Sequence, residues 1–143
     1  MANLLEIKDK VQRYLAADVK GLLIDNDGDF SFRLDSARVF VRVSEWFDEH
    51  IVVTIFSWVL NGLTVTSELK DYVALEGGDF MMGGMVLRVM DDGTANLMFS
   101  YSLLGDFLDK DELSIAWRAV ASSAERKDDE LKARFGGERF HED

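Results

Sequence analysis

The spacing of the apolar residues changes repeatedly along the chain. Leu4, Ile7, Val11 and Leu15 recur at steps of three and four residues, which is the spacing of one face of an α-helix. From Leu22 onward the apolar residues largely alternate with polar ones, which is typical of β-strands. The helical spacing returns after residue 109. This order predicts an α+β fold rather than an all-helical or all-strand one.

The first half of the sheet is predicted as a meander. Strands are expected over residues 22–25, 30–34, 37–43 and 51–60. Asp27-Gly28 and Asp35-Ser36 are short turn sequences, whereas residues 44–50 form a longer charged connection. Such short connections join neighbouring antiparallel strands. The first helix, capped by Asn3, needs a face of this sheet to cover.

The second half of the chain predicts two more helices around one hairpin. A short helix begins near residue 64 or 66 and ends at Gly77-Gly78. Strands over residues 81–90 and 94–103 follow, and then a long helix with an Asp109/Glu112 capping box. We therefore expect one α+β domain over residues 1–143, with an antiparallel sheet covered on one face by the N- and C-terminal helices.

Composition excludes several classes of partner and site. The 143 residues hold no cysteine, which excludes a disulfide framework and makes a reducing, cytoplasmic setting the default. Lys and Arg number 16 against 27 Asp and Glu, for a net charge of -11. This balance predicts neither nucleic acid nor a membrane surface as a partner, because both are bound through clustered cations. It predicts a soluble protein with an acidic surface.

No motif in the chain carries catalytic or metal chemistry. The stretch beginning at Asp25 resembles a calcium loop, but Phe30 and Ser36 stand where that loop needs glycine and glutamate. The glycines from Gly78 to Gly84 lack the lysine of a phosphate loop. Two histidines cannot form a histidine cluster, and no G-x-S-x-G elbow is present. We expect no catalytic, cofactor or metal site, and no enzyme.

Apolar residues suggest a binding surface instead. The strand over residues 51–60 is apolar on both faces, so one sheet face would stay exposed in a monomer. Methionines in the second hairpin suit varied partners, although for any one of them a place in a core gap is favoured. Trp46, Trp58 and Trp117 pose the same choice, and Trp117 on the helical stripe favours the core. The predicted protein-binding or dimer residues are Phe56, Trp58, Met82, Met85, Met98 and Tyr101.

Three stretches give the chain a resemblance to a known family. The first joins Asp27-Gly28-Asp29-Phe30 to residues 37–41, and the second runs from Leu103-Leu104-Gly105-Asp106 into Glu112-Leu113. The third runs from Asp128-Asp129-Glu130-Leu131 to Arg134-Phe135-Gly136-Gly137. In this order they resemble the YbjN family and the CesT-like type III secretion chaperones, in particular an actinobacterial-type branch.

The resemblance implies a chaperone-like, non-enzymatic homodimer that holds an apolar or extended segment of a client protein. It brings no catalytic residues, and the client's role in secretion, stress response or regulation stays open. The charge of -11 supports an alternative, an acidic inhibitor or regulator of a nucleic-acid-binding or signalling protein. Salt separates the two, because charge mimicry weakens with salt whereas apolar capture does not.

Overall fold

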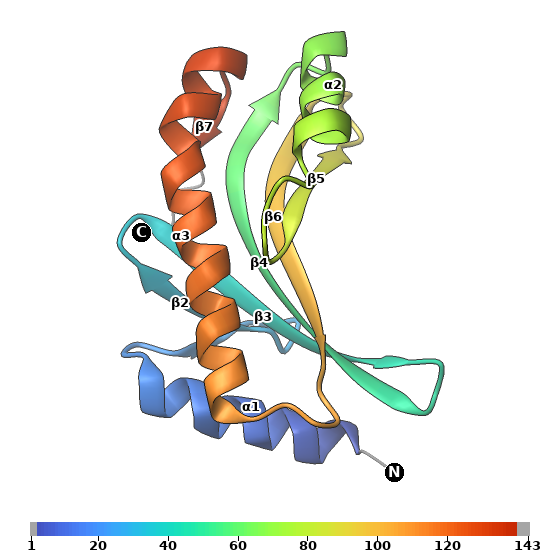
Figure 1. The fold of residues 1–143 in the computed structure, drawn as a ribbon, viewed down its shortest axis with the longest axis vertical. Helices are drawn as coiled ribbons and strands as arrows, with labels where there is room; N and C mark the ends of the chain where they lie inside the picture. The colour runs from blue at the N-terminus through green and yellow to red at the C-terminus, as the bar shows by residue number, and fades with distance from the viewer. Residues whose placement is uncertain (1–2, 140–143) are drawn as a thin grey trace.

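A computed structural model of the protein describes residues 3–139, which form three helices and seven strands (Figure 1). In chain order these elements are α1 (Leu4–Asp18), β1 (Leu23–Ile24), β2 (Phe30–Leu34), β3 (Ala37–Trp46), β4 (His50–Leu63), α2 (Ser67–Glu76), β5 (Gly84–Val89), β6 (Ala95–Leu104), α3 (Lys110–Phe135) and β7 (Glu138–Arg139). The order of helices and strands predicted from the sequence is confirmed, with β7 as an addition.

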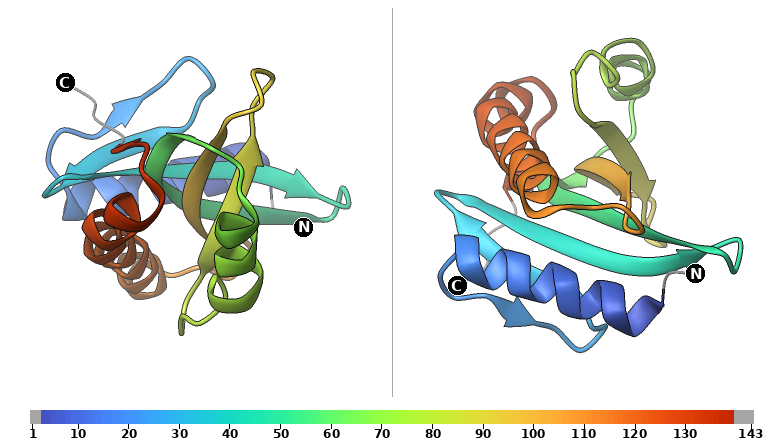
Figure 2. Two further views of the ribbon diagram at one scale, coloured as in Figure 1. Left: turned by 90° about the horizontal axis from the view of Figure 1, so that it is seen from above. Right: turned by 60° about the horizontal axis from the view of Figure 1, so that its bottom comes forward.

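All strand pairs in the sheet are antiparallel, in the order β1-β2-β3-β4-β6-β5, and β7 pairs with the far end of β4. β3 and β4 form a hairpin that extends past the rest of the sheet (Figures 1 and 2). β4 is central because it pairs with β3, β6 and β7. A predicted meander thus continues into a second hairpin across β4.

The helices cover one face of the sheet, which we call the helix face; the opposite one is the open face. On the helix face, Val41 pairs with Ile55 and Val43 pairs with Val53, and all four are buried. Helix α3 places Trp117 against Phe32, with the ring centroids 4.9 Å apart in an edge-to-face arrangement. Helix α1 adds its buried stripe of Ile7, Val11 and Leu15 to the same core. The predicted placement of the first and last helices is confirmed.

Side-chain caps define where the helices begin. The Asn3 side chain accepts hydrogen bonds from the backbone amides of Leu5 and Glu6 at 2.8 and 3.4 Å. At α3 the Asp109 carboxylate accepts from the amide of Glu112, whose own side chain accepts from the amide of Asp109. These contacts satisfy amide groups that have no partner within the helix.

Several strand boundaries differ from those expected. β4 runs on to Leu63, three residues past its expected end, because Asn61-Gly62 forms an irregular stretch of the strand rather than ending it. The connection between β3 and β4 is only residues 47–49, because both strands continue to the pair Trp46 and His50. β5 begins at Gly84 rather than at residue 81. Gly83 has a φ of +94°, and a Cβ there would lie 2.7 Å from the Phe99 ring, so the backbone needs glycine where it passes this ring. Phe80, just before the turn, packs edge-to-face on Phe99.

Asp18, at the end of α1, joins this helix to the start of α3. Its carboxylate accepts a hydrogen bond from the Ser114 hydroxyl, and its Oδ1 lies 3.2 Å from Lys110 Nζ. The hydrogen bond from Ser114 and the charge of Lys110 lower the pKa of Asp18 below its ordinary value of 3.8. The ionised form is therefore the one that stabilises this helix junction.

This junction predicts a specific acid dependence of stability. A depressed pKa means that the folded chain binds fewer protons here than the unfolded chain does, so stability rises with pH over this range. The contribution is complete above pH 3.8 and is lost as the pH falls through the lower pKa of the folded state. We expect Asp18→Asn to flatten this part of the profile in urea unfolding. The exposed Asp9→Asn variant should follow the parent.

Candidate functional site

The open face of the sheet carries the side chains that alternate with the buried ones. Antiparallel pairing places Phe56 opposite Phe40 on one side and Ser100 on the other. Successive rows along β4 are about 7 Å apart, because a strand rises roughly 3.4 Å per residue and every second residue faces the same way. The rows are Ser44/Val52/Leu104, Arg42/Thr54/Ser102, Phe40/Phe56/Ser100 and Trp58/Met98/Val86.

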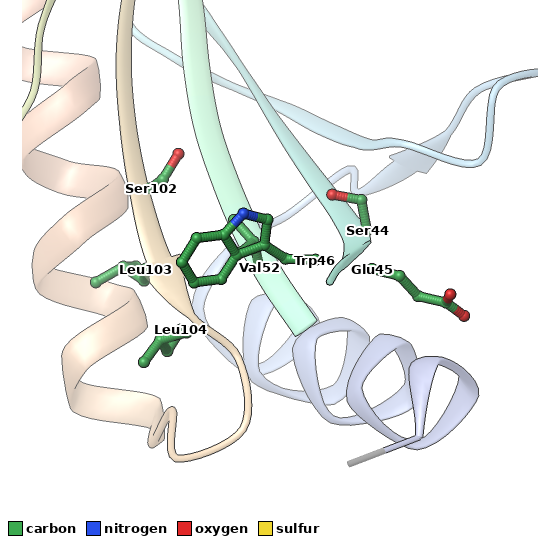
Figure 3. A pocket seen from close by; sticks show the side chains of 7 residues that line it. All are labelled: Ser44, Glu45, Trp46, Val52, Ser102, Leu103 and Leu104. Atoms are coloured by element: carbon green, nitrogen blue, oxygen red, sulfur yellow. The ribbon is translucent and has the colours of Figure 1, made fainter. Parts of the chain in front are cut away.

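At the hairpin end of this face lies a shallow hollow of about 440 Å³, which we call the hairpin pocket. Figure 3 shows the Trp46 indole lying over β4, between Ser44 and the side of β6 that carries Leu104, while Glu45 points away. Trp46 is 48% exposed and Leu104 46%. The hairpin pocket therefore offers an apolar surface to solvent. Its lining residues are Ser44, Glu45, Trp46, Val52, Ser102, Leu103 and Leu104.

Asp106 holds the strand ends beneath the hairpin pocket in place. Its Oδ1 accepts a hydrogen bond from the Ile51 amide at 2.8 Å, and its Oδ2 lies 2.9 Å from His50 Nδ1. These hydrogen bonds, His50 first, lower the pKa of Asp106. The Gly105 amide adds a bond to the Ile51 carbonyl at 2.7 Å. Since the end of β6 is tied to the start of β4, the pocket is formed before any ligand arrives.

A second hollow, of about 460 Å³, lies further along the open face, and we call it the arginine pocket. The Arg42 guanidinium lies 5.4 Å from the centre of the Phe56 ring, and Trp58 meets that ring edge-on. Arg88 of β5, which pairs with Asn96 one row beyond Met98, lines the other end of the same hollow. Two cations thus border a floor of aromatic and thioether side chains. The lining residues are Arg42, Thr54, Phe56, Trp58, Arg88, Met98 and Ser100.

The structure brings together half of the six predicted binding residues. Phe56, Trp58 and Met98 share the open face and line the arginine pocket. Met85 pairs with Phe99 on the helix face and is buried, and Tyr101 pairs with Ile55 on that face. Met82 lies in the turn before β5 and packs against the core, where it lines a hollow beside α3. The three residues on the helix face lie outside the open-face site.

The exposed part of this face differs from the expected one. Phe56 and Met98 are only 8% and 7% exposed in the single chain. Phe40 stacks on Phe56 at 5.2 Å, and Arg42 and Trp58 cover the same ring. The exposed large apolar side chains of this face are instead Trp46 and Leu104, with Leu23 at the β1 edge, and none of them was among the predicted site residues. Trp46 was missed because the strand over residues 37–43 was expected to end there, with residues 44–50 as a connecting loop. Recognising that the strand continues to Trp46 would have placed this side chain on the sheet.

Three aspartates form the one carboxylate cluster of metal-binding size among residues 3–139: Asp25, Asp27 and Asp29. Asp25 Oδ1 accepts hydrogen bonds from the amides of Asp27 and Asp29 at 2.9 and 3.0 Å. Asp29 is buried and binds Arg42 through both oxygens. Asp25 therefore stabilises the turn, as expected of an aspartate in the predicted hairpin turn, and Asp29 orients Arg42.

Comparisons with known proteins agree with this fold. A family model named TY-Chap1, described as "T3SS (YopN, CesT) and YbjN peptide-binding chaperone 1", matches residues 5–143. Among curated proteins, none is similar enough in sequence to count as a relative. The described helices include none long and apolar enough to cross a membrane.

Two solved structures share the architecture at low sequence identity. The Yersinia pestis type III secretion chaperone SycH, solved with a stable fragment of YscM2, superposes with a TM-score of 0.56 at 12% identity. That match covers 84% of this chain and 98% of SycH. YbjN from E. coli, described as a putative transcription regulator, gives a TM-score of 0.62 at 10% identity, covering 87% of this chain and 92% of YbjN. At these identities the likeness establishes the fold.

Proposed function

This chain belongs to the family of T3SS and YbjN peptide-binding chaperones, and on that premise we propose that it binds an extended apolar segment of a client protein on its open face. The observation that carries the proposal is the hairpin pocket, where Trp46 and Leu104 are half exposed on strands paired with β4. An aromatic anchor in a preformed apolar hollow is the usual centre of a binding surface. The family and fold point to a non-enzymatic role.

The dimensions of the open face suit an extended client. From Val52 to Trp58 the face runs six residues along β4, or about 20 Å. An extended segment has the same side-chain repeat as the sheet, so alternate client residues would meet successive rows. The hairpin pocket would take one apolar client side chain, and the rows toward Trp58 would take the next ones. A reducing cytoplasmic setting suits this protein, which has no cysteine.

Without a client, we propose that two copies cover each other's open faces as a symmetric homodimer. The apolar side chains of Trp46, Leu104 and Trp58 would then leave water at a two-fold contact. A client segment would compete with the second copy for the same surface. The dimer therefore serves as the resting state of the binding face rather than as a separate assembly.

A calorimetric titration tests the binding proposal. The probe is an acetylated, amidated peptide, Gln-Thr-Val-Thr-Leu-Thr-Val-Thr-Gln, which alternates apolar and polar residues in the manner of a strand. Binding with a negative heat-capacity change is expected, because apolar surface leaves water. A control peptide with serine in place of leucine and valine should not bind. Equal behaviour of the two peptides would contradict the proposal, and binding of a lysine-rich peptide alone, lost with salt, would favour the acidic regulator.

The homodimer makes its own prediction about salt. Each copy carries a net charge of -11, so two copies repel at low ionic strength. Added salt screens this repulsion, and sedimentation velocity should show the dimer fraction rising with salt. Trp58→Asp should leave a monomer, whereas Ile115→Asp on the outer side of α3, at a residue 58% exposed, should still dimerise. A monomer at every salt concentration would rule the dimer out.

A further inference from the structure

The charge on the open face is opposite to that of the chain as a whole. The strand pairing places Arg33 opposite Arg38 on this face, and Arg42 and Arg88 follow on β3 and β5. Across these rows, the described strand residues that face this side include no aspartate or glutamate. The carboxylates beside this face are those of Asp25, Asp27 and Asp29 in the turn before β2, where Asp29 pairs with Arg42. An acidic protein thus presents a cationic, aromatic binding face. A partner that matches this face carries negative charge next to apolar groups.

The two cations of the arginine pocket differ in how far their charge is already compensated. Arg42 forms a bidentate pair with the buried Asp29, with Nη2 to Oδ2 at 2.7 Å and Nε to Oδ1 at 3.0 Å. Arg88 is exposed, and within residues 3–139 it forms no ion pair or side-chain hydrogen bond. The charge of Arg42 is therefore already neutralised by Asp29, while the charge of Arg88 is available to a ligand.

We propose that the arginine pocket binds an aspartate or glutamate side chain of the client, with Arg88 as the main partner. This inference rests on the proposed function, because it assumes that an extended segment lies along the open face. The Ser100 and Thr54 hydroxyls line the same hollow and can donate to a carboxylate. Trp58 and Met98 form its apolar floor, which excludes part of the water that would otherwise screen the pair.

The strand geometry also sets the spacing of the client's residues. The hairpin pocket is centred on the row of Val52, and the arginine pocket on the row of Phe56. These rows are four residues apart, or about 13 Å. A client segment lying along β4 would thus place its acidic residue four positions from the apolar residue under Trp46. The inferred recognition pattern is an apolar residue and a carboxylate at this spacing.

The test compares two peptides that differ only in charge. One is Glu-Thr-Val-Thr-Leu-Thr-Val-Thr-Glu, acetylated and amidated, so that side chains carry its only carboxylates. The other is the glutamine peptide of the calorimetric titration. Glutamates on both sides of the leucine allow either chain direction. Fluorescence anisotropy should give a preference for the glutamate peptide of about two- to fivefold, the size typical of a partly exposed ion pair. The preference should shrink with added salt.

Matched variants assign the preference to Arg88. Arg88→Gln should bind both peptides equally and keep its affinity for the glutamine peptide. Arg13→Gln removes the same charge from the exposed side of α1 and should keep the preference. Equal binding of both peptides by the parent protein, or a preference that survives Arg88→Gln, would overturn this inference while leaving the proposed function standing. Failure of both peptides to bind would instead count against the proposed function.

A third peptide separates the two sources of a carboxylate. It ends four residues after the leucine with threonine and a free C-terminus, and it is compared with its amidated form. The inference commits to a side chain, so amidation should change the affinity little. A gain from the free C-terminus without any gain from glutamate would overturn it.

Discussion

Trp46→Ala is expected to weaken binding of the extended apolar peptide by on the order of tenfold or more, the effect typical of an aromatic residue at the centre of an interface. The Trp46 indole covers much of the hairpin pocket, and its truncation would leave Val52 and Leu104 without a wall on the β3 side. Because Trp46 is 48% exposed, the folded chain loses little packing. Calorimetry with the glutamine peptide measures the loss.

The control for this experiment is an exposed apolar residue elsewhere. Ile115 on α3 is 58% exposed and lines neither open-face pocket, so Ile115→Ala should bind the peptide like the parent. Thermal melts of both variants should overlay that of the parent, which would separate lost binding from lost folding. Undiminished binding by a folded Trp46→Ala protein would mean that the client does not use the hairpin pocket.

The fold was predictable because local signals agreed with one another along the chain. The Asn3 cap, the Asp109 capping box and the alternation over residues 37–43 each reappear as an element boundary or a buried face. Trp117 was expected in the core and is buried there. The pair of residues in β7 was not predicted, because its pairing with Leu60 and Asn61 depends on contact across the sheet. Two residues are too few to show the alternation by which a strand is recognised in a sequence.

The site was predictable only in part, because alternation does not say which face the helices cover. In β4 both Ile55 and Phe56 are apolar, and only the packing of α1 and α3 decides that Phe56 faces away from them. The methionines of the second hairpin were ambiguous for the same reason, and Met85 and Met98 take opposite faces. The cationic character of the open face was hidden, since its arginines are spread over three strands.

Trp117→Ala is expected to have the largest effect on stability, lowering the free energy of unfolding by about 3–5 kcal/mol. Trp117 is 4% exposed and lies where α3 crosses the sheet, edge-on to Phe32. Its removal leaves a cavity under a helix that carries much of the core. Since domains of this size are stable by roughly 5–15 kcal/mol, the variant should melt on the order of 10 °C or more below the parent.

Urea unfolding followed by circular dichroism would measure this loss, and Ile115→Ala on the same helix serves as the matched control. The control changes an exposed side chain and should shift stability by less than about 0.5 kcal/mol. A loss below about 1 kcal/mol for Trp117→Ala would mean that the core closes around the missing indole, since the cost of such truncations depends on how far a site can collapse. Because Trp117 packs on the helix face, a variant still folded at low temperature should bind the peptide as the parent does, which separates the core from the binding face.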